Sequence, residues 1–261
     1  MEQLFAIKIG GNVIDQPEAL AAFLDDYVRI DGKKILIHGG GKIATDISRA
    51  LGIETQMVDG RRITSAEVLK VVTMVYGGLI NKTIVSGLQA RGGNAIGLTG
   101  ADANTILARK REDKKIDYGY VGDIERVNVA PIMQFLSAGL SPVFAPLTHD
   151  GKGTMLNTNA DTIAAALASA LCSHYRTRLI YCFDKKGVLA SADENTVIPR
   201  LTLAQYNDLK AKSVISKGML PKLEEAFAAL ESGVTAVVLC HASQVRLAVD
   251  GDPKVGTTLA L

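Results

Sequence analysis

Short apolar runs alternate with helix-patterned segments along the whole chain, and this alternation restricts the fold more than any other feature. The runs are rich in Val, Ile and Leu, as in strands buried on both sides. Such strands, separated by helices, are typical of a mainly parallel sheet covered on both faces, so we expect an α/β fold. The predicted strands cover residues 4–9, 34–38, 95–98, 142–145, 179–183 and 236–239. One predicted helix begins at residue 17, and another begins at Thr64 with capping-box spacing. The other predicted helices cover 43–51, 160–171, about 202–212 and about 220–232.

Two segments interrupt this pattern. Residues 105–127 are charged and contain glycine, which favours a hairpin that leaves the main sheet. Residues 172–177 break the apolar pattern and mark the predicted seam between two parts of the chain.

Composition and charge exclude several classes of protein. The 261 residues are 48% hydrophobic and carry a net charge of +2, which gives no broad electrostatic reason to bind nucleic acid or an anionic membrane. No apolar run approaches the roughly 18 residues of a membrane span, and no basic leader precedes the first strand. Cys172, Cys182 and Cys240 lie far apart in apolar segments, so we expect buried, reduced thiols, not disulfides or a metal site. These features predict a cytoplasmic protein.

Glycines follow two of the predicted strands, at Gly10 and Gly11 and at residues 39–41. Loops at the carboxyl ends of parallel strands form the ligand crevice of such sheets. Glycine there lets backbone N–H groups approach an anion, although tight turns also favour it. Neither turn fits G-x-x-x-x-G-K-[ST] or a full G-x-G-x-x-G, which disfavours a P-loop enzyme or an ordinary dinucleotide fold.

Three cations stand in positions that call for a partner. Lys8 lies inside an apolar strand, so its ammonium group either reaches solvent or meets an anion at the strand end. Arg62, next to Arg61, suits a carboxylate, with a solvated pair as the alternative. Lys222 begins a predicted helix, where a positive charge opposes the helix dipole, so we expect it to have another role.

A polar cluster, Asn157-Thr158-Asn159-Ala160-Asp161, opens the helix predicted over 160–171. Helix N-termini attract anions through free backbone N–H groups and the helix dipole. The ordinary alternative is an N-cap formed by Asn159 or Asp161. Together with the glycine turns and the lysines, the cluster predicts a site for a polar, anionic molecule.

In order and spacing, these motifs resemble those of the N-acetylglutamate kinases within the amino acid kinase family. The matching segments are 8–11, 38–41, 60–64, 77–82, 122–124, 157–161 and 218–222, which span nearly the whole chain. The resemblance implies a three-layer α/β/α sandwich with a mainly parallel central sheet. It also implies an N-terminal lobe, 1–174, for the acyl amino acid and dimerisation, and a C-terminal lobe, 175–261, for ATP.

The resemblance also implies roles for single residues. Lys8 and Lys222 would stabilise the transferring phosphoryl group, and Asp161 would orient both lysines. The implied contacts with the acyl amino acid come from Gly40, Gly41, Arg62, Asn157 and Asn159. The implied contacts with ATP come from Gly10, Gly11, Asp184, Gly187, Ser216, Lys217 and Gly218. The family's Ser-Asp-Val-x-Gly loop reads Phe-Asp-Lys-Lys-Gly at 183–187, which leaves its contacts with ATP open.

The implied reaction transfers the γ-phosphoryl group of ATP, bound with Mg²⁺, to the γ-carboxylate of N-acetyl-L-glutamate in arginine biosynthesis. A carboxylate acceptor is already ionised at neutral pH, so the reaction needs no general base. Phosphoryl transfer depends mainly on alignment and electrostatic stabilisation, which lysines and glycine N–H groups can supply.

Several alternatives stay open. N-succinyl-L-glutamate would need only a different pocket wall, to which 105–127 could contribute. Other acceptors within the family are carbamate, aspartate, glutamate and UMP. The chain lacks room for an added domain, which disfavours aspartate kinases and the longer glutamate kinases, and Arg62 with Asn157 favours an acylated amino acid. A non-catalytic sensor would not need Lys8, Lys222 and Asp161 together. Seven residues precede Lys8, so we expect a homodimer without the N-terminal helix of arginine-inhibited members.

Overall fold

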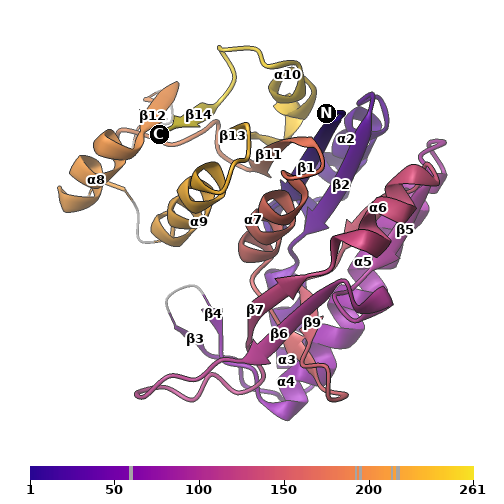
Figure 1. The fold of residues 1–261 in the computed structure, drawn as a ribbon. Helices are drawn as coiled ribbons and strands as arrows, with labels where there is room; N and C mark the ends of the chain where they lie inside the picture. The colour runs from indigo at the N-terminus through magenta and orange to yellow at the C-terminus, as the bar shows by residue number, and fades with distance from the viewer. Residues whose placement is uncertain (59–60, 192, 194–195, 213, 216–217) are drawn as a thin grey trace.

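The computed structural model describes residues 1–58, 61–191, 193, 196–212, 214–215 and 218–261 (Figure 1). In this part of the chain the main sheet has eight strands, and all neighbouring strands are parallel except β13 and β14. Their order is β12 (Arg200–Thr202), β14 (Thr257–Ala260), β13 (Ala236–His241), β11 (Arg176–Phe183), β1 (Gln3–Ile9), β2 (Lys33–His38), β8 (Ser141–Phe144) and β5 (Ala95–Leu98). The prediction of a mainly parallel sheet is confirmed.

Helices cover both faces of the sheet. One face carries α1 (Gly11–Ile14), α2 (Pro17–Val28), α3 (Gly41–Ala50), α4 (Ala66–Val72), η1 (Thr73–Ile80), α5 (Asn81–Gln89), η3 (Ala242–Gln244) and α10 (Val245–Asp250). The other carries α6 (Val129–Ser137), α7 (Ala160–Leu171), α8 (Leu203–Ala211) and α9 (Leu220–Glu231), with α7 beside α9 (Figure 1). The result is the predicted three-layer α/β/α sandwich.

The alternation of side chains along β1 explains why two cores form. Phe5, Ile7 and Ile9 enter the core beneath α2, whereas Leu4 and Ala6 enter the core beneath α7. Successive side chains of a strand point to opposite faces, so Lys8 belongs to the face of α7 and α9. The register of the strand therefore aims this lysine at one particular layer.

A smaller sheet carries the predicted hairpin excursion. It contains β10 (Met155–Asn157), β9 (Leu147–His149), β6 (Ile106–Lys110) and β7 (Gly122–Val127), with η2 (Asp102–Asn104) just before β6. The antiparallel pairing of β6 with β7 confirms the hairpin predicted over 105–127. A separate pair, β3 (Met57–Val58) and β4 (Arg61–Arg62), lies in the same part of the molecule, near α3 and α4 (Figure 1).

Three expectations need correction. The N-cap of α4 is Ser65, whose hydroxyl accepts a hydrogen bond from the Val68 amide, so the capping box predicted from Thr64 is wrong by one residue. Cys172 is partly exposed, whereas Cys182 and Cys240 are buried as expected, and all three are free thiols. The helical segment Ala66–Gln89 is long and apolar enough to cross a membrane by length and composition, contrary to our expectation. Its Val72 and Leu88 pack into the core beneath α2, as in the core helix of a globular protein.

Candidate active site

The glycine turns after β1 and β2 approach each other at the carboxyl edge of the main sheet. The Gly39 amide donates a hydrogen bond to the Ile9 carbonyl oxygen over 3.1 Å. A Cβ atom at Gly39 would lie 3.1 Å from the Gly11 nitrogen, and Gly40 has φ of 143°, which L side chains rarely adopt. Glycine is therefore required here by close backbone approach and by conformation, in addition to any ligand.

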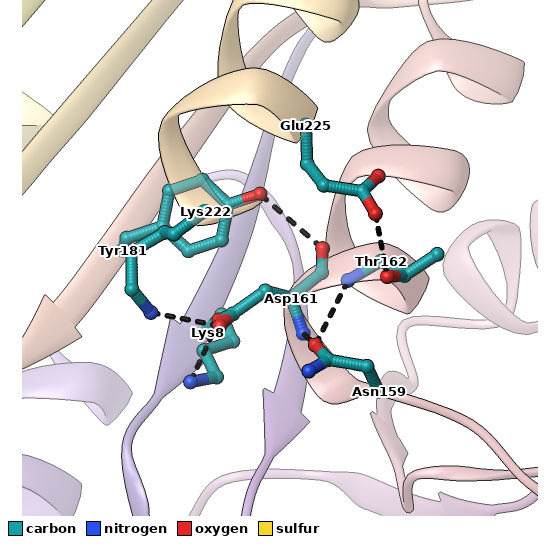
Figure 2. Close-up of polar contacts among 7 residues, drawn as sticks. All are labelled: Lys8, Asn159, Asp161, Thr162, Tyr181, Lys222 and Glu225. Atoms are coloured by element: carbon teal, nitrogen blue, oxygen red, sulfur yellow. Dashed lines mark hydrogen bonds and ion pairs between the residues drawn. The ribbon is translucent and has the colours of Figure 1, made fainter. Parts of the chain in front are cut away.

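Lys8, near the carboxyl end of β1, meets Asp161, which in turn meets Lys222 (Figure 2). The Lys8 Nζ lies 2.8 Å from Asp161 Oδ1, and the Lys222 Nζ lies 2.8 Å from Asp161 Oδ2. The three side chains are 9%, 14% and 18% exposed for Lys8, Lys222 and Asp161. One carboxylate therefore holds two ammonium groups that are far apart in sequence, the arrangement that the resemblance implies.

The charges of this cluster depend on one another. Burial alone raises the pKa of Asp161, but the ammonium groups of Lys8 and Lys222 outweigh burial and hold that pKa well below its usual range. Burial, and then repulsion from Lys8, lowers the pKa of Lys222, and attraction to Asp161 only partly offsets this. Asp161 is therefore an ionised anchor at neutral pH, which suits a holder of lysines better than a proton acceptor.

Two aromatic rings of β11 lie under Lys222. Its Nζ lies 5.5 Å from the ring centre of Tyr181 and 5.8 Å from that of Phe183, within the range of cation–π attraction. The Tyr181 hydroxyl donates a 3.2 Å hydrogen bond to the Asp161 carbonyl oxygen (Figure 2). The sequence interpretation missed Tyr181, although a tyrosine inside the buried run 179–183 was a signal that its hydroxyl needs a partner.

Asn159 forms the N-cap of α7. Its Oδ1 accepts hydrogen bonds from the amides of Asp161 and Thr162, which satisfies two donors of the first helical turn (Figure 2). The cap interpretation of the polar cluster is therefore confirmed for Asn159. It also fixes the start of the helix on which Asp161 stands.

A pocket of about 170 Å³ opens at the start of α7, where Ala160 and Thr162, the chain neighbours of Asp161, line it. Its lining includes all five residues predicted to contact the acyl amino acid: Gly40, Gly41, Arg62, Asn157 and Asn159. The structure thus brings together residues from α3, β4, β10 and the start of α7. The residues that the resemblance assigns to one ligand thus line one cavity.

Arg62 has one buried nitrogen that makes no hydrogen bond with the described residues. Its Nη2 donates hydrogen bonds of 2.8 Å to the Gly41 carbonyl oxygen and to the Thr45 hydroxyl. Its Nη1 is buried and has no hydrogen-bond partner among the described residues. Because an unpaired buried donor is costly, this nitrogen is well placed to bind an anionic group that enters the pocket.

The hairpin contributes a second pair of charges to the same pocket. Arg111 donates a 2.9 Å hydrogen bond from Nε to Asp123, and both residues line the cavity. The guanidinium group also lies 5.5 Å from the ring centre of Tyr118. Sequence reasoning named the 105–127 segment as a wall but missed these residues, because a charged hairpin shows no sign of which side chains point inward.

The Gly39 turn has a buried support on the opposite face of the sheet. His38 Nδ1 pairs with the Gly39 carbonyl oxygen at 2.8 Å, and His38 Nε2 pairs with Asn81 Nδ2 at 3.2 Å. Because Asn81 Nδ2 is a donor, Nε2 accepts and Nδ1 carries the proton. Burial lowers the pKa of His38 to about 4, so the ring is neutral at physiological pH.

The residues predicted to contact ATP have diverse surroundings. Gly10 and Gly11 lie in the turn after β1, and Asp184 accepts a 2.9 Å hydrogen bond from Asn12 Nδ2 in the helix that follows. Gly187 is buried, and a Cβ there would lie 2.7 Å from Thr257 Oγ1 of β14. Gly218 is exposed in the turn before α9. Ser216 and Lys217 lie outside the described residues. Within the described ranges, no three His, Cys, Asp or Glu side chains group as a metal site would require.

An α/β/α sandwich with paired lysines and glycine turns at one sheet edge defines an enzyme-like site for anions. Comparison with known proteins identifies its class: residues 3–241 match the Amino acid kinase family. The chain is 56% identical to the acetylglutamate kinase of Cytophaga hutchinsonii, over 99% of both chains. It is 54% identical to that of Bacteroides thetaiotaomicron, over 94% of this chain and 96% of the relative. The chain belongs to the amino acid kinase family, which confirms the resemblance found in the sequence.

The fold extends to more distant proteins. The structure of N-acetylglutamate synthase from Neisseria gonorrhoeae, complexed with coenzyme A and N-acetyl-glutamate, superposes with a TM-score of 0.86. It is 20% identical and covers 100% of this chain but only 59% of its own. This likeness shows the shared fold alone.

Proposed function

We propose that this chain transfers the γ-phosphoryl group of ATP to the γ-carboxylate of an N-acyl-L-glutamate, with N-acetyl-L-glutamate as the first choice, in arginine biosynthesis. Relatives named acetylglutamate kinase match almost the whole chain. The observation that carries the proposal is the pair of ammonium groups held by Asp161, whose chain neighbours Ala160 and Thr162 line the same pocket as Arg62.

The chemistry follows from the charges. The acceptor carboxylate and the γ-phosphoryl group are both anionic, so repulsion is the main obstacle to their approach. The ammonium groups of Lys8 and Lys222 would offset that repulsion and stabilise the charge on the transferring group. One carboxylate oxygen of the acceptor forms a bond to phosphorus while the bond to the ADP oxygen breaks, and no proton needs to be removed.

The pocket supports binding of the rest of the acceptor. The free Arg62 Nη1 suits the α-carboxylate, together with Asn157 and Asn159. Backbone N–H groups of Gly40 and Gly41, at the start of α3, suit an anionic oxygen. The γ-carboxylate would then lie toward the lysines.

On the nucleotide side we propose that ATP enters as its Mg²⁺ complex, with the ion held by phosphate oxygens. Gly10 and Gly11 would approach the phosphates, and Asp184, Gly187, Ser216, Lys217 and Gly218 would surround the remainder of ATP. In this proposal residues 1–174 form the acyl-amino-acid lobe and 175–261 the ATP lobe. The sheet is continuous across that boundary, because β1 pairs with β11.

We also propose a cytoplasmic homodimer. Three free thiols suit a reducing compartment. Met74 and Leu79, on the helical segment 66–89, are 58% and 54% exposed, which suits contact with a second copy. Light scattering should give twice the chain mass, and a monomer or a hexamer would contradict this part of the proposal.

N-succinyl-L-glutamate is a second candidate acceptor, favoured by Arg111 in the pocket wall. A guanidinium group there could bind the additional carboxylate, although Asp123 already pairs with it. The kcat/KM values for the two N-acyl-glutamates should decide. A preference for the succinyl compound that disappears in Arg111→Met would favour this candidate.

A coupled ADP-release assay with a panel of acceptors tests the proposal as a whole. We expect ADP formation that requires an N-acyl-L-glutamate and is absent with carbamate, aspartate, glutamate or UMP. If no acceptor in the panel leads to ADP release, the result would favour a non-catalytic sensor of the same fold.

A further inference from the structure

Helix α9 is attached to the start of α7 by a second polar contact, one helical turn beyond Lys222 (Figure 2). The Thr162 hydroxyl donates a 2.7 Å hydrogen bond to Glu225 Oε1. Thr162 follows Asp161 directly, and Glu225 follows Lys222 by three residues, which places both α9 side chains on one face. Two adjacent residues of α7, Asp161 and Thr162, thus bind two side chains of α9, Lys222 and Glu225.

The surroundings of the Thr162–Glu225 hydrogen bond favour it. Both side chains are partly buried, so water competes less for the hydrogen bond than at an exposed surface. The Glu225 carboxylate also faces the first turn of α7, where the helix dipole favours a negative charge. Its neighbour Glu224 instead pairs with Lys210 of α8, so Glu225 and not Glu224 contacts the start of α7.

We infer that Glu225 and Thr162 are positioning residues that set the place of the Lys222 ammonium group relative to Asp161. This rests on the proposed phosphoryl transfer. Lys222 is in the first turn of α9, and its charge is useful only while that turn stays against α7. The rings of Tyr181 and Phe183 support the ammonium group from one side, and the Thr162–Glu225 hydrogen bond fixes the helix that carries it.

Thr162→Val and Glu225→Ala each remove the contact, and Thr162→Ser retains the hydroxyl. We expect the first two variants to lower kcat about tenfold, as loss of one hydrogen bond to a charged group does. The KM for N-acetyl-L-glutamate should change by less than about twofold. Thr162→Ser should recover most of kcat, and Glu224→Gln is the matched control that should leave kcat unchanged.

Variants at Lys222 separate positioning from general support. In a Lys222→Met background, Thr162→Val should cause no further loss, because its effect passes through the lysine. The double variant Thr162→Val, Glu225→Ala should lose about as much as either single variant. Another tenfold loss in the Lys222→Met background, or an effect confined to the KM for ATP, would overturn the inference.

Hydrogen exchange provides a readout that does not need activity. The backbone amides of 220–226 should exchange roughly several-fold faster in Thr162→Val than in the wild type, because this part of the helix opens locally more often. Their exchange in Glu224→Gln should match that of the wild type. An inactive wild type with this exchange difference would count against the proposed function alone. An active wild type whose variants show neither the exchange difference nor the loss of kcat would overturn the positioning role.

Discussion

Lys8 and Lys222 bind the same carboxylate, yet the chain holds them in different ways. Lys8 belongs to β1, which pairs with β2 on one side and β11 on the other, so its backbone is fixed by two hydrogen-bond ladders. Lys222 belongs to the first turn of an outer-layer helix, whose position depends on side-chain contacts with α7. The sheet fixes one cation, whereas packing and a few polar contacts fix the other. We therefore expect changes outside the charged groups to affect the Lys222 side more.

Removal of either charge should have the largest effect and should make the two sides look alike. Lys8→Met and Lys222→Met should each lower kcat by roughly 10²–10³, the loss seen when one electrostatic stabiliser of a transition state is removed. The Kd for ATP should change far less, because the charges act on the transferring group. Steady-state kinetics with equilibrium binding of ATP provides the check. A wild-type kcat in either variant would exclude that lysine from the transfer step.

Arg62 tests whether the pocket serves binding and the lysines serve catalysis. Arg62→Ala should raise the KM for the acyl amino acid by roughly 10- to 100-fold, as loss of a charged hydrogen bond does. The kcat should fall much less. An unchanged KM would mean that another residue binds the α-carboxylate or that the substrate lies in a different orientation.

The sheet-fixed side also predicts a pH dependence of stability. The pKa of buried His38 is about 4, against an ordinary value near 6.5, so between these values the unfolded chain binds a proton that the folded chain does not. The contribution of His38 to the free energy of unfolding should therefore be fully present above about pH 6.5. It should decrease as the pH drops toward 4, by up to about 3 kcal/mol.

Denaturant unfolding at several pH values measures the effect. His38→Gln removes the titrating ring and should flatten the curve between pH 6.5 and 4, whatever its effect on stability at pH 7. An equally steep curve in this variant would show that other groups dominate the window.

The smallest expected effect concerns the ring that supports Lys222. Tyr181→Phe keeps the aromatic face and removes the hydrogen bond to the Asp161 carbonyl oxygen. The change should lower kcat only a few-fold, about the worth of one neutral hydrogen bond. A loss as large as that of Lys222→Met would mean that the hydroxyl contacts the reacting groups themselves.

The sequence was most informative where local chemistry is unusual. A lysine inside the run 4–9 and a polar cluster at the start of α7 both demand partners, and Lys8 and Asp161 are indeed paired. The layers of the fold followed from the Val, Ile and Leu strands between helices. Thr162 and Glu225 could not be found in this way, because a threonine and a glutamate in helices are ordinary residues until the helices pack.

Boundaries were less predictable for the same reason. Ser65, not Thr64, caps α4, since Thr64 is instead bridged to Gly119 in the hairpin region. That pairing is long-range, and no local pattern reveals it. Arg111 and Asp123 were missed likewise, because only the fold of the hairpin brings them to the pocket.

The central claim is that Asp161 holds two lysines for transfer to a carboxylate, and trapping of the product tests it most directly. The acyl phosphate formed from ATP and N-acetyl-L-glutamate reacts with hydroxylamine, and the resulting hydroxamate can be measured for the wild type and for Asp161→Asn side by side. We predict hydroxamate from the wild type and at least about 10³-fold less from Asp161→Asn, since an amide cannot pair with two ammonium groups. A folded, ATP-binding Asp161→Asn protein that forms hydroxamate at the wild-type rate would contradict the account.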